Sequence, residues 1–226
     1  MPQRTQVILE PRKSPVQARS AASVDAILDA TIQVLLRVGK EQLTTTRVAS
    51  RAGVSVGTLY QYFPNKSALL QAALKRHMDE VANAIELVCK EQQGRTLRQM
   101  VTALITVFLQ AKMRDANSSV ALYSVSSDVD GAKIAQRTGI RSNKAIVRML
   151  QSASDPLTTD PQLVASLLQG AMAGVSRTIL ESGAAEKQLD TLRRELISMT
   201  CAYLDAGSAR RAHDPSRPAT RLSDTN

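Results

Sequence analysis

The sequence has few of the side chains on which catalytic and metal sites depend. Its 226 residues include only two cysteines, two histidines and no tryptophan. Cys89 and Cys201 lie far apart and belong to no CxxC or Cys/His pattern, so the sequence predicts buried thiols rather than a disulfide framework or a zinc site. No nucleophile–base spacing and no glycine-rich phosphate loop is visible. We therefore expect no catalytic residue, no metal and no cofactor.

Long apolar runs are missing as well. The longest candidate, residues 101–109, is interrupted by Thr102 and Thr106 and falls short of the roughly 18 residues that a membrane span needs. The first 20 residues lack the apolar core of a secretory signal. The sequence thus predicts a cytoplasmic protein with no membrane partner.

Acidic residues are the minority among the charges. Lys and Arg number 29 against 20 Asp and Glu, which gives a net charge of +9 and a pI near 9.9. Such an excess favours a polyanionic partner, with nucleic acid ahead of an anionic membrane surface. A basic soluble protein without such a partner has the same charge, so charge alone does not decide.

Most of the chain has the apolar period of α-helices. Apolar side chains recur every 3.6 residues and no segment has the pattern of a strand, so we expect an all-α protein. We predict a first helix from Ser23 to Gly39, a long helix after Lys66, and further helices at about 97–114, 120–127, 132–151, 160–180 and 186–204. The predicted organisation is a flexible basic arm (1–20), a helix-turn-helix domain (21–66), a helical domain (67–205) and a flexible tail (206–226).

The most informative segment is residues 44–70, TTTRVASRAGVSVGTLYQYFPNKSALL. Thr44 or Thr45 can cap a short helix, Gly53 supplies a tight turn, and a second helix ends at Pro64. Two short helices joined in this way can place the second one in the major groove of DNA. The exposed face of that helix would offer Val56, Gly57, Thr58, Tyr60 and Gln61.

Aromatic residues are only 3% of the chain, yet Tyr60, Tyr62 and Phe63 fall within four positions. All three could complete a small core, and Phe63 suits that role. Side chains on successive turns cannot all point inward, so at least one tyrosine should be exposed, with contact to a phosphate as its predicted role.

Residues 23–70 closely resemble the N-terminal DNA-binding domain of the TetR family. A threonine-led helix, a glycine turn, a TLYxYF-like recognition helix and an NK-led helix follow in the same order and spacing. By this resemblance, the positions that contact phosphates are Thr44, Thr45, Tyr60, Tyr62 and Lys66. The positions that face base edges are Ser55, Val56, Gly57, Thr58 and Gln61. Because Val56 and Gly57 have no side-chain donor, methyl contacts or DNA shape would contribute to specificity.

The same resemblance implies a C-terminal domain for ligand binding and dimerisation, with the dimer formed by the last two long helices. Residues 160–180 contain small side chains that permit close approach of another helix, flanked by apolar ones. The predicted interface residues are Leu163, Leu167, Gly170, Ala171 and Gly174. A contact within one chain explains the same pattern.

Flexible thioethers and aromatics among the central helices are candidates for an adaptable ligand pocket. The candidates are His77, Met78, Met100, Phe108, Met113, Tyr123, Met149 and Met172. Residues of these types are more often simple core than ligand contacts, and His77 could as easily be a surface histidine as a polar anchor.

The resemblance implies a transcriptional repressor with three partners: double-stranded palindromic operator DNA, a second copy of the chain, and a small-molecule inducer that releases the DNA. A helix-turn-helix protein that binds DNA constitutively accounts for the same N-terminal residues, and activation is open beside repression. A closed apolar cavity among the central helices would favour the regulated repressor, and a solid core would favour the constitutive protein.

Overall fold

The computed structural model describes residues 18–182 and 185–212, and every regular element in these ranges is helical. This confirms the all-α prediction. The elements are α1 (Ala18–Gln42), α2 (Thr45–Ala52), α3 (Val56–Tyr62), α4 (Lys66–Glu91), α5 (Leu97–Met113), α6 (Ala116–Ser124), the 3-10 turn η1 (Ser126–Asp128), α7 (Gly131–Gln151), α8 (Pro161–Glu181) and α9 (Ala185–Ala212). Most of the predicted arm lies outside the described residues, and α9 extends past residue 206, where the predicted tail begins.

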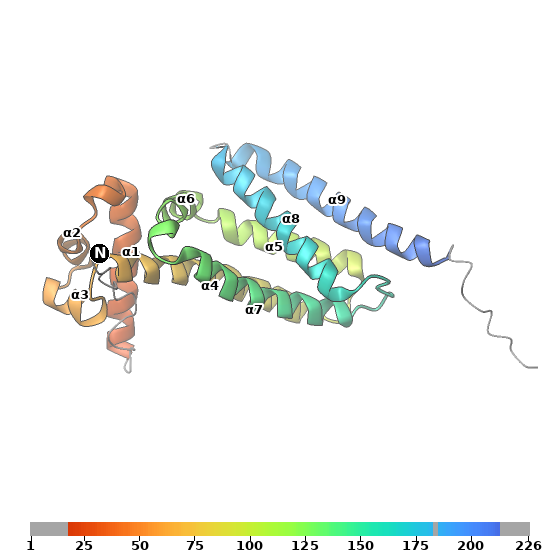
Figure 1. Cartoon of the computed structure of the whole chain (residues 1–226), viewed down its shortest axis with the longest axis horizontal. Helices are drawn as coiled ribbons and strands as arrows, with labels where there is room; N and C mark the ends of the chain where they lie inside the picture. Colours follow the sequence, from red (N-terminus) through yellow and green to blue (C-terminus); the bar gives the residue numbers. More distant parts are fainter. Residues whose placement is uncertain (1–17, 183–184, 213–226) are drawn as a thin grey trace, which may run out of the picture.

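Helices α1, α2 and α3 form a corner at one end of the molecule (Figure 1). Ile27 of α1, Val48 of α2 and Leu59 of α3 are fully buried, and Phe63 at the end of α3 closes the same core. Ala49 is 1% exposed. A larger side chain at this position would have no room and would push the neighbouring helices apart. Burial of these apolar side chains is what fixes the angle between the short helices.

Two glycines set the limits of these helices. Gly39 has φ +72° and breaks α1 near its end, and Gly53 has φ +68° and terminates α2 by donating to the Ser50 carbonyl at 3.3 Å. Left-handed backbone of this kind strains any residue with a Cβ. Both helix ends were predicted from these glycines.

Helix α4 connects the N-terminal corner to the larger body. The side chain of Asn65 caps it by accepting from the Ala68 amide at 2.8 Å. From there α4 runs into the body beside α7 (Figure 1). Arg141 of α7 ties the two helices together, pairing with Glu86 at 2.6 Å and with Asp79 at 3.4 Å.

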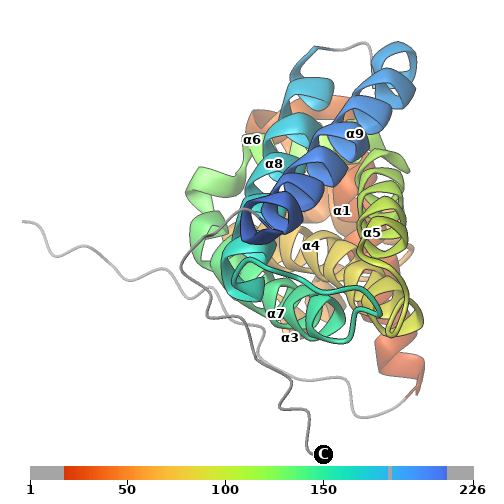
Figure 2. The same ribbon diagram turned by 90° about the vertical axis from the view of Figure 1, so that its right-hand side faces the viewer.

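The body is a bundle in which α8 and α9 pack against α5, while α4 and α7 form the lower side (Figure 2). Its core is centred on Met100, Leu104 and Ile105 of α5, none of which has exposed surface. Cys89 and Cys201 are free and buried, as predicted. Burial raises the pKa of Cys89 to about 12 and also raises the pKa of Cys201, so neither thiol is reactive at neutral pH.

A second core crosses the predicted boundary between the two domains. Leu122 of α6, Val125, Val129 and Ile134 of α7 are buried together with the apolar side chains of α1, α2 and α3. Helix α6 begins at Ala116, earlier than predicted, because the Asp115 side chain accepts from an amide of its first turn. The N-terminal corner is thus packed directly against the α6–η1 segment.

The turn from η1 into α7 depends on a close approach of two backbone segments. A Cβ added to Gly131 would lie 2.6 Å from both the Cβ and the carbonyl oxygen of Ser126. A neighbouring backbone atom at that distance cannot be avoided by a side-chain rotation. The preceding residue, Asp130, has φ +55°, which is uncommon outside glycine.

We expect Gly131→Ala to lower the free energy of unfolding by about 1–3 kcal/mol, because the methyl group would push η1 away from α7. Gly139→Ala, on the same helix, is the control: a Cβ there meets nothing within 4 Å. That change should stabilise the helix by about 0.5–1 kcal/mol. Urea unfolding measures both variants, and equal stabilities would contradict the close packing at Gly131.

Candidate functional site

Helix α3 is presented at the far end of the N-terminal corner, away from α8 and α9 (Figure 1). The Ser55 side chain caps it by accepting from the Thr58 amide at 2.9 Å, and the two hydroxyls lie 2.8 Å apart. Val56, Gly57 and Gln61 are exposed on its outer side. All five predicted base-facing residues therefore belong to one short helix and its cap, with Thr58 half-buried.

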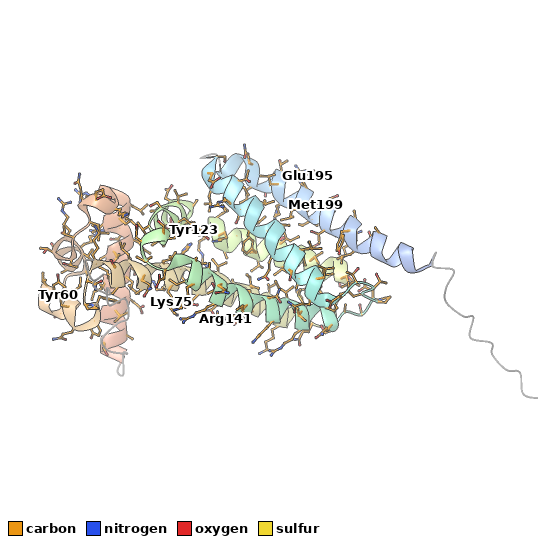
Figure 3. The ribbon with its side chains drawn as sticks, in the orientation of Figure 1. Tyr60, Lys75, Tyr123, Arg141, Glu195 and Met199 are labelled. Atoms are coloured by element: carbon orange, nitrogen blue, oxygen red, sulfur yellow. The ribbon has the colours of Figure 1, made fainter. Side chains whose placement is uncertain are left out.

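A hydrogen bond joins this helix to α2. The hydroxyl of Tyr60 lies 3.0 Å from Oγ1 of Thr45, and Tyr60 is 41% exposed at the end of the molecule (Figure 3). Of the two candidate threonines it is Thr44 that caps α2, accepting from the Arg47 amide at 3.3 Å. Two of the predicted phosphate-contacting hydroxyls, those of Thr45 and Tyr60, thus lie close to each other beside α3, whereas that of Thr44 caps α2.

The other two predicted phosphate contacts have partners inside the protein. Tyr62 is half-buried, with its ring centroid 6.5 Å from that of Phe63. The ammonium of Lys66 donates to the carbonyl of Lys40 at 2.6 Å, where Gly39 has broken α1. Lys66 therefore satisfies a carbonyl at a helix end, and its contact with a phosphate stays a prediction.

Two arginines of α2 lie near this surface and were not among the predicted residues. Arg47 donates to the Gln42 carbonyl at 2.7 Å, and Arg51 donates to Oε1 of Gln33 at 2.6 Å. Both are exposed, and they lie one turn apart on the helix. Their i, i+4 spacing in a basic chain was the signal that could have found them.

The predicted ligand residues do not meet in one place. Met100, Met149 and Met172 are buried in the core of the body, with Phe108 beside them, whereas Met78 packs against the N-terminal core. Among the eight candidates Met113 lines an open depression of about 490 Å³. The depression lies between α4, α5 and α9 and is lined by Ala84, Val107, Gln110, Ala111, Met113, Arg114 and Leu189.

His77 and Tyr123 lie instead near the junction of α4, α5 and α6. Ser119 donates to the carbonyl of Lys112 at 3.1 Å, so Nε2–H of His77 donates to the Ser119 hydroxyl at 3.0 Å. Burial, the largest cause, and the charge of Lys112 together lower the pKa of His77 to about 4. His77 is therefore a buried, neutral, hydrogen-bonded histidine at neutral pH.

Helices α8 and α9 expose apolar side chains on their outer faces. Leu163 and Leu167 are each 50% exposed, and a Cβ added at Gly170 or Gly174 would meet nothing within 4 Å. The neighbouring Ala171 is half-buried. Met199 of α9 is 57% exposed on the outer edge of the body (Figure 3), and Tyr203 lies one turn further along.

By length and composition α8 is apolar enough to cross a membrane, with a mean hydropathy of 1.4 over 18 residues. Only 39% of that window is buried. Ser166 and Gln169 interrupt the apolar residues of α8, so α8 contains no continuous apolar run of membrane-spanning length. Apolar groups on both sides of a helix are equally typical of a helix enclosed between two protein surfaces.

Two family models match this chain. Residues 27–73 match "Bacterial regulatory proteins, tetR family", and residues 96–204 match "Tetracyclin repressor-like, C-terminal domain". The first covers the corner that presents α3, and the second runs from the start of α5 to near the end of α9. The chain belongs to the TetR family of transcriptional regulators. This is a family of regulatory DNA-binding proteins.

Relatives and solved structures agree with the TetR fold. The transcriptional repressor KstR of Rhodococcus jostii is 36% identical over 89 residues, which are 39% of this chain and 40% of KstR. KstR of Mycobacterium tuberculosis is 47% identical over 55 residues, 24% of this chain and 25% of that protein. The chain thus matches less than half the length of these relatives.

The structural matches extend over most of the chain. A putative TetR-family regulator from Mesorhizobium loti has a TM-score of 0.70 and 19% identity, covering 84% of this chain and 98% of its own. FadR of Bacillus subtilis, solved with stearoyl-CoA, has a TM-score of 0.57 and 19% identity over 77% of this chain and 97% of its own. At this identity the matches show the TetR fold alone.

Gln61 is the exposed amide on the recognition helix of this TetR-family chain, and an amide can pair with adenine in the major groove. We expect Gln61→Ala to relax base preference at one position per half-site by about 1–3 kcal/mol and to leave the fold intact. Tyr60→Phe, which removes a predicted phosphate contact, should weaken binding to all sequences alike. Titration of a DNA panel distinguishes them, and a uniform loss for Gln61→Ala would make it a phosphate contact.

His77 should make the stability of the protein dependent on pH. The unfolded chain takes up the imidazole proton below the ordinary pKa of 6.5, whereas the folded protein does so only near 4. The stability from neutral His77 is therefore present above pH 6.5, and about 3 kcal/mol of it is lost as the pH falls to 4. Urea unfolding of wild type and His77→Gln across this range isolates the effect, and parallel pH profiles would contradict it.

Proposed function

We propose that this chain is a repressor that binds palindromic operator DNA as a homodimer and releases it when a small molecule binds. The observation that carries the DNA-binding part is the outer face of α3. There Val56, Gly57 and Gln61 are exposed, and Tyr60 and Thr45 place hydroxyls beside them. Small side chains allow close approach to base edges, and hydroxyls at the border suit phosphates.

The outer faces of α8 and α9 support the homodimer. Leu163, Leu167, Met199 and Tyr203 expose apolar surface along two neighbouring helices, and Gly174 leaves room for a close helix contact. Exposed apolar surface of this extent favours a protein partner. A twofold axis through this face would combine two recognition helices, and a spacing of roughly 34 Å between them matches one turn of DNA.

The packing of α6 supports release by an effector. Helix α6 contacts α1 of the DNA-binding corner on one side and α5 and α8 of the body on the other. The ion pair between Lys40 and Asp128, at 2.6 Å, and the bond from Gln71 to the Val129 carbonyl, at 3.2 Å, connect η1 to the corner. A ligand that shifts α6 would therefore reorient α3 and change the fit to both half-sites.

A constitutive DNA-binding protein without an effector is not favoured. The depression of about 490 Å³ beside α5 is open to solvent, so it is not the closed apolar cavity that would by itself favour a regulated repressor. What favours an effector is the direct packing of the DNA-binding corner on α6, together with relatives that are repressors and FadR, which is solved with stearoyl-CoA. A protein that never releases DNA has no use for such coupling.

Selection of bound sequences from random DNA with the purified chain tests this function. A regulator of this kind should enrich one inverted repeat, whose half-sites are separated by about one turn of DNA. Enrichment of a single half-site, or of no sequence, would overturn the dimeric operator reading.

We expect Gly174→Leu to yield monomers or a splayed dimer, with far weaker operator binding and an intact N-terminal corner. Within one protomer a Cβ added at Gly174 meets nothing within 4 Å, so a loss of assembly would point to a partner helix packed against α8. Gly139→Leu on α7 is the matched control, since Gly139 also has nothing within 4 Å of an added Cβ. Sedimentation equilibrium measures both variants, and normal dimers of Gly174→Leu would overturn this interface.

A further inference from the structure

Lys112 is a buried cation in the last turn of α5. It is 7% exposed, and no other Lys, Arg, Asp or Glu is buried among the side chains that the structure describes. A buried ammonium is costly unless an opposite charge or several acceptors compensate for the loss of water. The surroundings of Lys112 therefore decide whether this position is structural or is built to receive something.

The structure provides Lys112 with little compensation. Its ammonium donates to the hydroxyl of Tyr123 and lies 4.4 Å from the centroid of that ring. Within the described part of the chain it forms no ion pair. One hydroxyl and one aromatic face leave most of the charge uncompensated, since an ammonium can donate three hydrogen bonds.

The nearby polar groups are already engaged. The Ser119 hydroxyl donates to the Lys112 carbonyl at 3.1 Å and accepts from His77 at 3.0 Å. The Asp115 carboxylate accepts from the amide of Ser118 at 2.9 Å and from its hydroxyl. Among the described residues the Asp115 carboxylate forms no ion pair with Lys112, so its two accepted bonds hold the start of α6 rather than the ammonium.

Tyr123 is the cover of this position. It lies on α6 near the junction with the N-terminal helices (Figure 3), and it is 38% exposed although its hydroxyl reaches a buried ammonium. The Tyr123 hydroxyl is therefore the contact that an incoming anion would have to replace. Phe108 lies one turn before Lys112 on α5 and is buried, so apolar surface continues behind the ammonium.

We propose that Lys112 binds the anionic group of the effector, a molecule with one negative charge and an apolar body, which replaces the Tyr123 hydroxyl as the partner of the ammonium. This inference rests on the proposed function, because it assumes that an effector exists and names the chemical class of that molecule. A single ammonium, with the Asp115 carboxylate nearby, suits a monoanionic carboxylate better than a dianionic phosphate. The positive charge of Lys112 acts on the neighbouring His77, whose pKa it lowers.

The probe is 11-(dansylamino)undecanoic acid, a fluorescent carboxylic acid, and its methyl ester is the matched probe without the charge. Wild type should bind the acid about tenfold or more tightly than the ester, because only the acid neutralises the buried ammonium. Lys112→Met should lose this preference and keep its affinity for the ester, and Lys112→Arg should retain much of it. Lys133→Met removes an equal charge from an exposed site on α7 and should change nothing.

Three results would overturn the anion site. They are equal affinity of wild type for the acid and the ester, no binding of the acid, and a Lys112→Met variant that keeps the preference. Stronger displacement of the probe by dodecyl phosphate than by dodecanoate would overturn the monoanionic class. If Lys112→Met fails to fold, comparison of acid and ester binding to wild type and Lys112→Arg still decides whether the anion site exists.

Binding of selected operator DNA, measured with and without the probe, tests this inference separately from the proposed function. The affinity of each protein for the operator without probe is its own reference: the acid should lower this affinity for wild type and leave that of Lys112→Met at its reference value. Sequence-specific DNA binding without preference for the acid would sink the anion site and leave the repressor intact. Preference for the acid in a chain that binds no specific sequence would sink the repressor and leave the site.

Discussion

The rest of the structure depends on the burial of the α6–η1 segment against the N-terminal corner. A domain of three helices, two of them short, has little core of its own, because its surface is large for its volume. Here Leu122, Val125 and Val129 extend that core with side chains from the second half of the chain. Stability of the DNA-binding corner and its orientation on the body therefore come from the same contacts. A change in the packing of α6 therefore alters both the stability of the corner and its orientation on the body.

This packing also explains why the turn before α7 is constrained. The segment must leave α6, contact the corner and return into α7 within a few residues, and Gly131 is the position at which the backbone passes Ser126 most closely. Asp130 accepts a left-handed conformation just before it. Conformational strain of this kind persists only where the surrounding packing holds it in place.

Much of this was predictable from the sequence, for reasons that differ between regions. The helix-turn-helix was predicted well because its determinants are local: Thr44 and Ser55 cap, Gly53 turns, and Leu59 and Phe63 are one turn apart. The core that joins Leu122 to the corner was not predictable, because it brings together residues far apart in the chain. For the same reason the eight ligand candidates, chosen by residue type, are spread over two cores, a surface depression and the junction of α4, α5 and α6.

The burial of Lys112 could not be predicted from its residue type. In the sequence it is one of 29 basic residues, at the polar end of an apolar helix, where a lysine that favours the helix dipole is expected at the surface. Its burial arises because α6 turns back over the end of α5 and places Tyr123 above the ammonium. The helix dipole stabilises a positive charge at this end of α5, and that partly offsets the loss of water. Tyr123, which excludes water from the ammonium, belongs to α6, and α6 is the helix that packs against the DNA-binding corner.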